Sequence, residues 1–292
     1  MTVSASMVKE LRDQTGCAMM DCKRALLESD GDIQAAVDLL RKKGMATADK
    51  RSSKTAAEGK VVAIGAADRK TAFMAEVNSE TDFVARDSSF NAFVQLVAEQ
   101  GLAHQPADLA STLSIAVDGQ TLDDVRTALI GKIGENIQVR RVATLSSNGV
   151  IGTYCHGDRI AVMVALDIED ESLAKDIAMH IAASAPQALT PADVPEALVA
   201  KEREIFGAQA KESGKSDDVV AKMIEGRVAK FLKEVSLTAQ PFVKDPSVTV
   251  AELLQSHAAT IKSFVRFEVG EGIEKQTPDF ASEVMAQVKG TE

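Results

Sequence analysis

The chain has 292 residues, of which 45% are hydrophobic and 26% are charged. This composition is typical of a folded globular protein with more than one core, and it excludes a disordered chain. The 43 acidic residues outnumber the 33 basic ones and give a net charge of −10. Direct nucleic-acid binding is therefore disfavoured, because it depends on neutralising phosphates, and a protein partner or a small ligand is favoured instead.

The N-terminal residues show neither a basic stretch before an apolar run nor an Arg-rich, acid-poor pattern, so no signal or transit peptide is predicted. No apolar run approaches the roughly 20 residues needed to cross a membrane. The three cysteines, Cys17, Cys22 and Cys155, form no CxxC pair. This pattern favours the reducing cytoplasm and argues against a disulfide framework or a zinc knuckle.

The first fifty residues or so predict a compact unit of three helices. The first helix contains Val8 to Arg12 and ends at Gly16, the second begins at Met19, and the third begins at Ile33 and stops at Gly44. Before any family is considered, helix core is the favoured interpretation of Met19 and its neighbour Met20. Consecutive helical residues lie about 100° apart, however, so one of the two could be exposed.

A strand–turn–strand–helix unit is expected next, after a linker from Ala46 to Lys60. Its strands are predicted over 61–65 and 71–77, and its helix shows apolar residues at the i, i+3, i+4, i+7 spacing from Phe90 to Ala98. The segments expected after it are a poorly patterned loop over 103–114, a helix over 122–133 and a strand over 137–145. Asn148-Gly149 then predicts a hairpin turn into a strand over 150–156.

The connection from Asn78 to Ser89 is longer than a strand-to-helix junction needs. It places Phe83 beside Asp82, which we interpret as an unpaired acid, with Thr81 available as a helix N-cap. Phe83 lies seven residues before Phe90 and could share its buried stripe, so periodicity leaves core and interaction site equally open.

A second copy of the unit begins about ninety residues later. Asp68-Arg69 before the second strand recurs as Asp158-Arg159 before an apolar strand from Ile160 to Ile168. This copy reaches its helix within a few residues and has no counterpart of the segment around Phe83. The segment is therefore not required to complete the fold.

The composition changes to charged, Ala-rich helix between Pro191 and Gln240. Helices over 197–212 and 217–235 flank Ser213-Gly214-Lys215, which predicts a helical hairpin projecting from the core. The elements expected after it are a short helix over 250–254, a strand over 264–269 and an amphipathic helix over 280–288.

No catalytic or ligand-binding constellation stands out. Gly214-Lys215-Ser216 lacks the earlier glycine of a Walker A motif, because position 209 is Gln. The four histidines show no metal-ligand spacing, and neighbours on a strand such as Cys155 and His156 point to opposite faces. We therefore expect no enzymatic activity, no cofactor and no metal site.

Several stretches together resemble bacterial translation elongation factor Ts over essentially the whole chain. They are Val8–Arg12 with Thr15-Gly16, Met19–Lys23 and Ala25-Leu26; Glu80–Ala85; Lys132–Ile137; His156-Gly157; Ile177–Ala183; and Phe267–Gly272. One departure from the family pattern is Cys155 before His156, which should matter little if only the imidazole makes a contact.

The resemblance implies an α+β fold with a core of two related subdomains, each an antiparallel sheet with helices. The implied domains are an N-terminal three-helix, ubiquitin-associated-like domain over 1–54, core subdomain N over 55–145, core subdomain C over 146–195 and 241–272, a helical hairpin (coiled coil) over 196–240, and a C-terminal module over 273–292.

The resemblance also implies a cytoplasmic guanine-nucleotide exchange factor, not an enzyme in the covalent sense, which binds elongation factor Tu in its GDP-bound and nucleotide-free forms. Asp82 and Phe83 match residues that insert near the partner's nucleotide and magnesium site, and Thr81 and Val84 flank them. The other positions that match partner contacts are Arg12, Met19, Met20, Ile133, Gly134 and His156. The C-terminal helix would lie against the partner's GTPase domain.

Two other classes stay open at this point. A non-catalytic adaptor or dimerising scaffold could use the three-helix unit or the hairpin, and it would bind elongation factor Tu equally well with or without saturating GDP. An enzyme is the weakest alternative, because no constellation supports one. The sequence leaves homodimer formation undecided.

Overall fold

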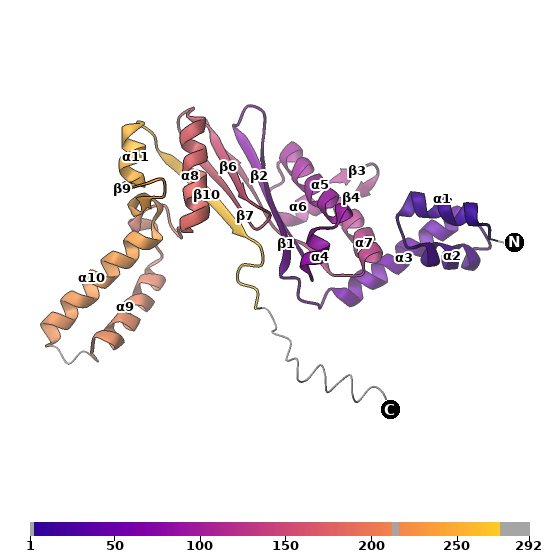
Figure 1. Cartoon of the computed structure of the whole chain (residues 1–292), viewed down its shortest axis with the longest axis horizontal. Coiled ribbons are helices and arrows are strands. Elements are labelled where there is room, and N and C mark those ends of the chain that lie inside the picture. Colours follow the sequence, from indigo (N-terminus) through magenta and orange to yellow (C-terminus); the bar gives the residue numbers. More distant parts are fainter. Residues whose placement is uncertain (1–2, 212–215, 275–292) are drawn as a thin grey trace.

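The computed structural model describes residues 3–211 and 216–274. These residues form helices and small antiparallel sheets, which confirms the predicted α+β class. The molecule is elongated, with three N-terminal helices at one end and two long helices near the other (Figure 1). The helix predicted over 280–288 lies outside the described residues.

The first three helices, α1 (Ala5–Thr15), α2 (Met19–Glu28) and α3 (Ile33–Arg51), pack around a small apolar core. The chain leaves α1 through Gly16, whose φ of 65° suits a residue without a Cβ, and the Gly16 N–H donates to the Arg12 carbonyl. The side chains of this core are Val8, Leu11, Cys22, Ala25, Leu26, Ala36 and Leu40.

The prediction that α3 stops at Gly44 is wrong. Gly44 is a buried helical residue, and a Cβ added to Gly131 of α7 (Leu122–Ile133) would lie 2.8 Å from the Gly44 Cα. The two glycines let α3 and α7 approach closely, and this contact offsets the roughly 0.5–1 kcal/mol that a mid-helix glycine costs. The linker predicted over 46–60 is too long, because α3 continues to Arg51 and the next strand begins at Glu58, which leaves only residues 52–57 between them.

The first sheet has the order β1-β2-β5, with all pairs antiparallel. Its strands are β1 (Glu58–Gly65), β2 (Thr71–Ser79) and β5 (Ile137–Ser146). Phe73, Ala75 and Val77 of β2 share an apolar core with residues of α5 (Ser88–His104) and α7.

The segment predicted as a loop over 103–114 contains a short helix, α6 (Leu109–Leu113), followed by β3 (Ala116–Val117) and β4 (Gln120–Thr121). Asp108 caps α6 by accepting a hydrogen bond from the Ser111 N–H. A helix of five residues is too short to produce a periodic apolar signal, which is why the pattern did not reveal it.

The second sheet repeats this order of elements, with β6 (Ile151–His156) and β7 (Ile160–Leu166) as a hairpin and β10 (Ile261–Glu268) against β7. The helix that follows the hairpin is α8 (Glu171–Ser184). Alternate residues of β7 face opposite ways, so Val162 and Val164 pack with α8 whereas Met163 packs with Met74 of β2. The result is four layers, helix–sheet–sheet–helix (Figure 1).

β5 and β6 do not form the hairpin predicted at Asn148-Gly149, because they belong to different sheets. This dipeptide instead lies where the chain crosses from one sheet to the other. The Ser147 hydroxyl donates to the Leu166 carbonyl at 2.6 Å, and a Cβ at Gly149 would lie 2.4 Å from the same oxygen. Glycine is needed there for close approach to the end of β7, and not for a hairpin turn.

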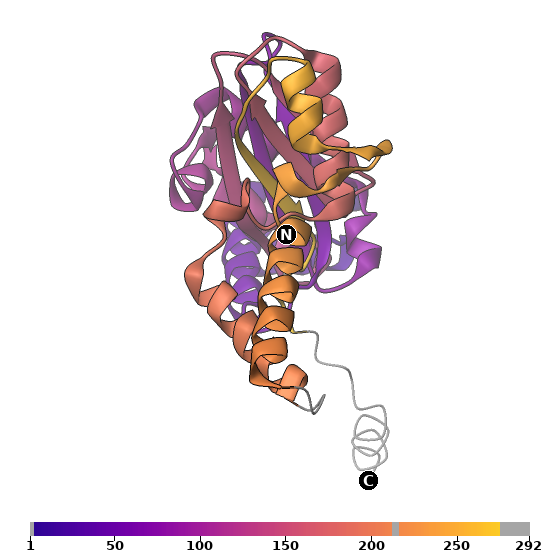
Figure 2. The ribbon, with the colours of Figure 1, turned by 90° about the vertical axis from the view of Figure 1, so that its left-hand side faces the viewer.

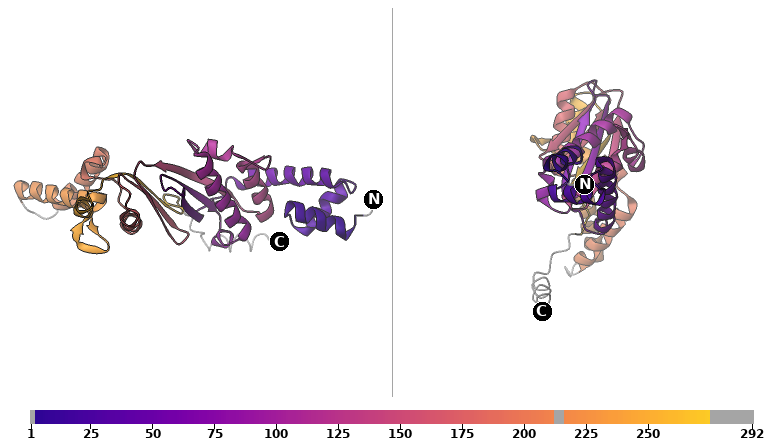
Figure 3. Two further views of the ribbon diagram at one scale, coloured as in Figure 1. Left: turned by 90° about the horizontal axis from the view of Figure 1, so that it is seen from above. Right: turned by 90° about the vertical axis from the view of Figure 1, so that its right-hand side faces the viewer.

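Two antiparallel helices, α9 (Glu196–Lys211) and α10 (Asp217–Val235), extend away from the sheets (Figure 2 and Figure 3). The start of α9 and both bounds of α10 agree with the predicted helices to within one residue, and the predicted end of the first helix at residue 212 lies outside the described residues. The short elements that join them to the second sheet are η1 (Pro191–Asp193), η2 (Leu237–Ala239), β8 (Pro241–Phe242), β9 (Asp245–Thr249) and α11 (Val250–Ser256).

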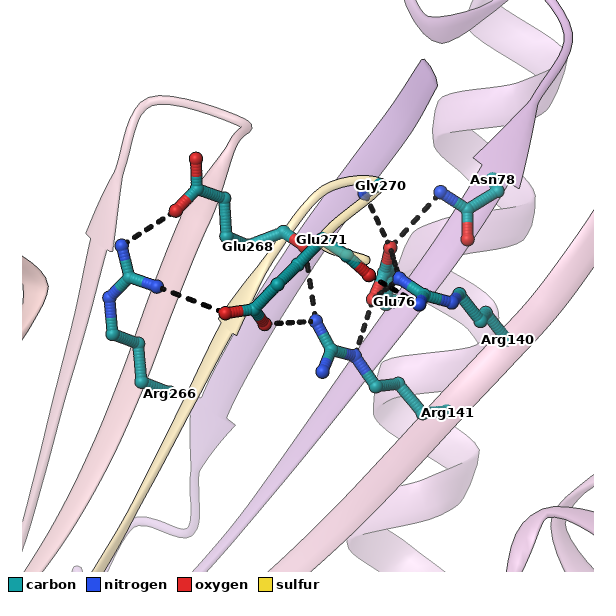
Figure 4. A network of polar contacts seen from close by, with 8 residues as sticks. All are labelled: Glu76, Asn78, Arg140, Arg141, Arg266, Glu268, Gly270 and Glu271. Atoms are coloured by element: carbon teal, nitrogen blue, oxygen red, sulfur yellow. Dashed lines mark hydrogen bonds and ion pairs between the residues drawn. The ribbon is translucent and has the colours of Figure 1, made fainter. Parts of the chain in front are cut away.

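A buried carboxylate joins the two sheets. Glu76 of β2 has no exposed surface, and its carboxylate accepts hydrogen bonds from Arg141 Nε at 2.5 Å, Arg140 Nη1 at 3.1 Å and the Gly270 N–H at 2.8 Å (Figure 4). Arg140 and Arg141 are neighbours on β5, yet both reach Glu76 because the β2–β5 pairing shifts register at this point. Arg141 continues to Glu271, beyond the end of β10.

Candidate functional site

The segment around Phe83 forms a single helical turn, α4 (Asp82–Ala85), between β2 and α5. Thr81 is its N-cap, as predicted, and its side-chain oxygen accepts from the Val84 N–H at 3.5 Å. The Ser79 hydroxyl donates to the Thr81 carbonyl at 2.9 Å. Polar contacts on both sides of Thr81 therefore fix the direction in which α4 leaves the sheet.

Phe83 points away from the protein. Its side chain is 78% exposed, whereas the next residue, Val84, is only 7% exposed and packs in the first core. Consecutive helical positions lie about 100° apart, so burying Val84 turns Phe83 outward. Among the described residues no large apolar side chain is more exposed. Of the two alternatives that periodicity left open, the structure excludes a core position for Phe83.

Asp82 is not the unpaired acid expected from the sequence. Arg86, one turn later, approaches its carboxylate at 3.0 Å, and 52% of the Asp82 side chain is exposed. An exposed ion pair of this spacing is worth only about 0.3–0.5 kcal/mol. The carboxylate can therefore exchange Arg86 for another group at little cost.

Two carboxylates fasten α4 to the end of α7. Glu135 accepts hydrogen bonds from both the Thr81 N–H at 3.0 Å and the Thr81 hydroxyl at 2.8 Å. In return, Glu80 accepts from the Asn136 N–H at 2.6 Å and forms an ion pair with Arg51 of α3 at 3.4 Å. We call Glu80, Thr81, Glu135 and Asn136 the α4–α7 clasp.

The α4–α7 clasp brings two of the predicted contact regions together. Gly134, immediately before Glu135, ends α7 with a φ of 83°, and Ile133 is half-buried in the first core. Lys132 reaches from the same helix end to the Ser89 hydroxyl at 2.7 Å. Sequence reasoning placed Ile133 and Gly134 in the site but gave no reason for them to lie beside Thr81.

The structure does not bring the N-terminal candidates next to α4. Arg12 lies on α1, and Met19 and Met20 form the start of α2, at the end of the elongated molecule (Figure 1). Both methionines are exposed, at 54% and 66%, so the core interpretation of this pair is wrong. Ala18 opens α2 ahead of them, and the helix core is formed by Cys22, Ala25 and Leu26 instead.

His156 lies on the second sheet, separate from the α4–α7 clasp. It is exposed at the end of β6, and its Nδ1 lies 3.1 Å from the Tyr154 hydroxyl. Cys155 is also exposed, and its thiol makes only a long contact to the Ala63 carbonyl. Although the residue is exposed as a whole, desolvation around the sulfur raises the pKa of the Cys155 thiol, so it is poorly suited to act as a nucleophile.

The described residues contain no group of three or more His, Cys, Asp or Glu side chains placed to hold a metal ion. His180 is buried, with Nδ1 accepting from the Val243 N–H at 3.1 Å and Nε2 facing the Gln240 side chain at 2.9 Å. Burial lowers the pKa of this histidine, which serves the fold. In the part of the chain that can be described, no helix is both long and apolar enough to span a bilayer.

Comparison with known proteins places these features in a family context. The family model described as "Elongation factor TS" matches residues 80–271. The chain is 55% identical over 292 residues to elongation factor Ts of Coxiella burnetii (strain RSA 493 / Nine Mile phase I), covering 99% of each chain. It is 53% identical to elongation factor Ts of Thioalkalivibrio sulfidiphilus, over 99% of this chain and 100% of that protein. For Legionella pneumophila (strain Paris) elongation factor Ts, the identity is 50% over 289 residues and 99% of each chain.

Proposed function

This chain belongs to the elongation factor Ts family of translation elongation factors, and we propose that it is a guanine-nucleotide exchange factor for elongation factor Tu in the cytoplasm. It binds the GDP-bound and nucleotide-free forms of that partner and promotes GDP release. The observation that carries the proposal is the 78% exposed ring of Phe83 on a helical turn that is hydrogen-bonded to the end of α7. The exchange factor brings no cofactor or metal of its own to this process.

Phe83 acts as a wedge in this proposal. Leaving a phenylalanine ring in water forgoes about 1.5–3 kcal/mol of burial free energy, which becomes available when the ring enters an apolar pocket of a partner. A ring inserted between packed helices of a GTPase shifts one of them, because packed interfaces respond by discrete rearrangement. The shift moves the groups that hold the nucleotide phosphates away from their binding geometry.

Asp82 acts on the magnesium ion. Tight nucleotide binding by a GTPase depends on that ion and on backbone N–H groups around the phosphates. A carboxylate brought close to the site competes for the water molecules and side chains that surround the ion. The exposed pair with Arg86 leaves Asp82 free to turn toward the partner at a cost of only a few tenths of a kcal/mol.

The remaining predicted residues dock the factor on its partner. Arg12, Met19 and Met20 grip the GTPase domain from the three-helix unit, Ile133 and Gly134 contact it beside α4, and His156 contacts a more distal domain. Two exposed methionines at the start of a helix suit such docking, because methionine is flexible and polarisable enough to fit an apolar surface. In this proposal the three-helix unit is a ubiquitin-associated-like domain and α9–α10 form a coiled coil.

Exchange follows from reciprocal coupling. If the exchange protein weakens the affinity of elongation factor Tu for nucleotide by some factor, nucleotide weakens its affinity for the exchange protein by the same factor. The corresponding coupling free energy is typically about 1–3 kcal/mol or more. GTP binding therefore expels the factor and lets it act again.

The test is release of a fluorescent GDP analogue from elongation factor Tu, chased with excess GDP, with and without this chain. We expect faster release that saturates with factor concentration. Unchanged release, together with binding that saturating GDP does not weaken, would identify an adaptor or scaffold instead.

A further inference from the structure

The α4–α7 clasp is more elaborate than a turn of four residues needs. It is reciprocal, because each of the two segments supplies a carboxylate that accepts hydrogen bonds from the other segment. Glu135 accepts both hydrogen-bond donors of Thr81, and Glu80 accepts the Asn136 N–H. Hydrogen bonds to charged carboxylates are shorter and roughly twice as strong as neutral ones.

The second sheet shows that the fold can be built without such a clasp. There β7 ends at Leu166 and α8 begins at Glu171, with Asp170 capping the helix through the Leu173 N–H at 2.9 Å. No short helix stands between β7 and α8, so there is nothing to orient. Of these two units, both within the described residues, the one with the exposed ring carries the clasp and the other does not.

Helix α7, which ends at the clasp, also packs against the three-helix unit that carries Met19 and Met20. Near its start, Asp124 of α7 pairs with Arg41 of α3 at 2.6 Å. In its last turns, Gly131 packs against Gly44 of α3. Helix α7 thus contacts α3, which belongs to the unit bearing the methionines, and through Glu135 it contacts the N-cap of α4.

We infer that Glu135 is a positioning residue for nucleotide exchange, which acts by holding Phe83 in a fixed direction relative to the docking surface. This inference rests on the proposed exchange function. Glu135 touches neither the nucleotide nor the magnesium ion in this account. It restricts α4 to one orientation before the partner binds. Insertion of the ring therefore does not have to bear the entropy cost of ordering α4, which would weaken it.

A Glu135→Ala variant removes both acceptors from Thr81 and tests the inference. We expect the release rate at saturating factor to fall about tenfold. The factor concentration for half-maximal effect should change less than about threefold, because Met19 and Met20, which dock the factor, are unaffected. The matched control is Glu99→Ala on α5, an exposed glutamate whose side chain accepts only from Gln95. It should leave both quantities unchanged.

Two further variants separate positioning from a loss of structure. Glu135→Gln keeps one acceptor oxygen for Thr81 and should restore the saturating rate to within about threefold of the wild-type value. Glu135→Ala combined with Phe83→Ala should be no slower than Phe83→Ala alone, because a residue that acts through the ring has no effect once the ring is gone.

Each outcome bears on a separate part of the account. A saturating rate for Glu135→Ala equal to that of the wild type would overturn the inference, and so would fully additive effects of the two alanine substitutions. If Glu135→Ala unfolds, the Glu135→Gln variant decides. A Gln chain that melts like the wild type should lose no more than about threefold in saturating rate, and this loss should disappear when it is combined with Phe83→Ala. A loss that persists without the ring, or no loss at all, would overturn the inference. Failure of the wild-type chain to accelerate release would defeat the proposed function and not the clasp.

Discussion

Replacing Glu76 by Gln should destabilise the pair of sheets substantially. The wild-type carboxylate is fully buried and accepts from Gly270, Asn78, Arg140 and Arg141. A glutamine whose oxygen takes the Oε1 position can keep the hydrogen bonds from Gly270, Asn78 and Arg140 Nη1 at 3.1 Å. Its NH2 group then faces Arg141 Nε and the second, 3.3 Å contact of Arg140 Nη1, which both bond the other oxygen of the wild-type carboxylate. Two charge-assisted hydrogen bonds are lost, each worth about 1.5–3 kcal/mol.

The expected cost is smaller than that sum because the guanidinium groups remain partly in water. The Arg140 and Arg141 side chains are 27% and 29% exposed, so water can replace part of the lost interaction. We expect about 2–4 kcal/mol of lost unfolding free energy, compared with the 3–5 kcal/mol that is typical when a fully buried pair is broken. At about 2–4 °C per kcal/mol, the melting temperature should fall by roughly 5–15 °C.

The assay is thermal unfolding followed by circular dichroism, with Glu99→Gln as the control. That glutamate is exposed on α5, so its substitution should change the unfolding free energy by less than about 0.5 kcal/mol. If Glu76→Gln melts within a degree of the control, Glu76 does not join the sheets as described, and the reasoning from its buried hydrogen bonds fails.

The difference in unfolding free energy between the wild type and Glu76→Gln should also depend on pH. Burial raises the pKa of Glu76, but hydrogen bonds from Gly270, Arg141, Asn78 and Arg140 outweigh it and hold that pKa below the ordinary 4.5. The unfolded chain therefore takes up this proton more readily than the folded chain, and the stabilisation is present above about pH 4.5 and lost as the pH falls through the folded pKa. The melting temperatures of the wild type and Glu76→Gln should therefore converge as the pH is lowered. A difference between them that stays constant down to pH 3 would contradict the lowered pKa of Glu76.

Gly131→Ala places a methyl group 2.8 Å from the Gly44 Cα, so α3 and α7 must separate. We expect the factor concentration for half-maximal exchange to rise several-fold, while the melting temperature of the sheets stays the same. An unchanged concentration for half-maximal exchange would show that this contact does not set the docking geometry. Replacing 197–231 by a short glycine linker keeps Val235, whose carbonyl accepts the Gln187 N–H at 2.8 Å. The shortened chain should stay folded and retain exchange within about threefold of the wild type, since no wedge residue is removed; unfolding of the remainder would contradict this view of the hairpin.

Much of the fold could be predicted because local patterns and tertiary packing agree. The apolar spacing from Phe90 to Ala98 predicts α5, the helix caps at Gly16 and Thr81 are used as expected, and the continuous apolar run of β7 reflects a strand buried on both faces. Where one residue type serves two purposes, the pattern misleads. Gly44 signals a helix end but serves helix–helix contact, and Gly149 signals a hairpin but serves close approach to the end of β7.

The site was harder to predict because its geometry depends on long-range contacts. Only tertiary structure shows that Val84, and not Phe83, faces the core. Glu135 follows a helix-ending glycine and carries no periodic signal of its own, yet it binds both donors of a residue 54 positions earlier. The resemblance to a known family supplied the candidate residues, and the structure shows which hydrogen bonds hold the segment that carries Phe83.

The most direct test of the wedge is the rate of fluorescent GDP release from elongation factor Tu at saturating factor, measured for the wild-type chain and for Phe83→Ala. Because the ring is largely in water, the variant should melt like the wild type. We expect its saturating release rate to be about tenfold lower, which corresponds to roughly 1–2 kcal/mol of binding energy used to open the nucleotide site. A folded Phe83→Ala chain that releases GDP as fast as the wild type would contradict the account.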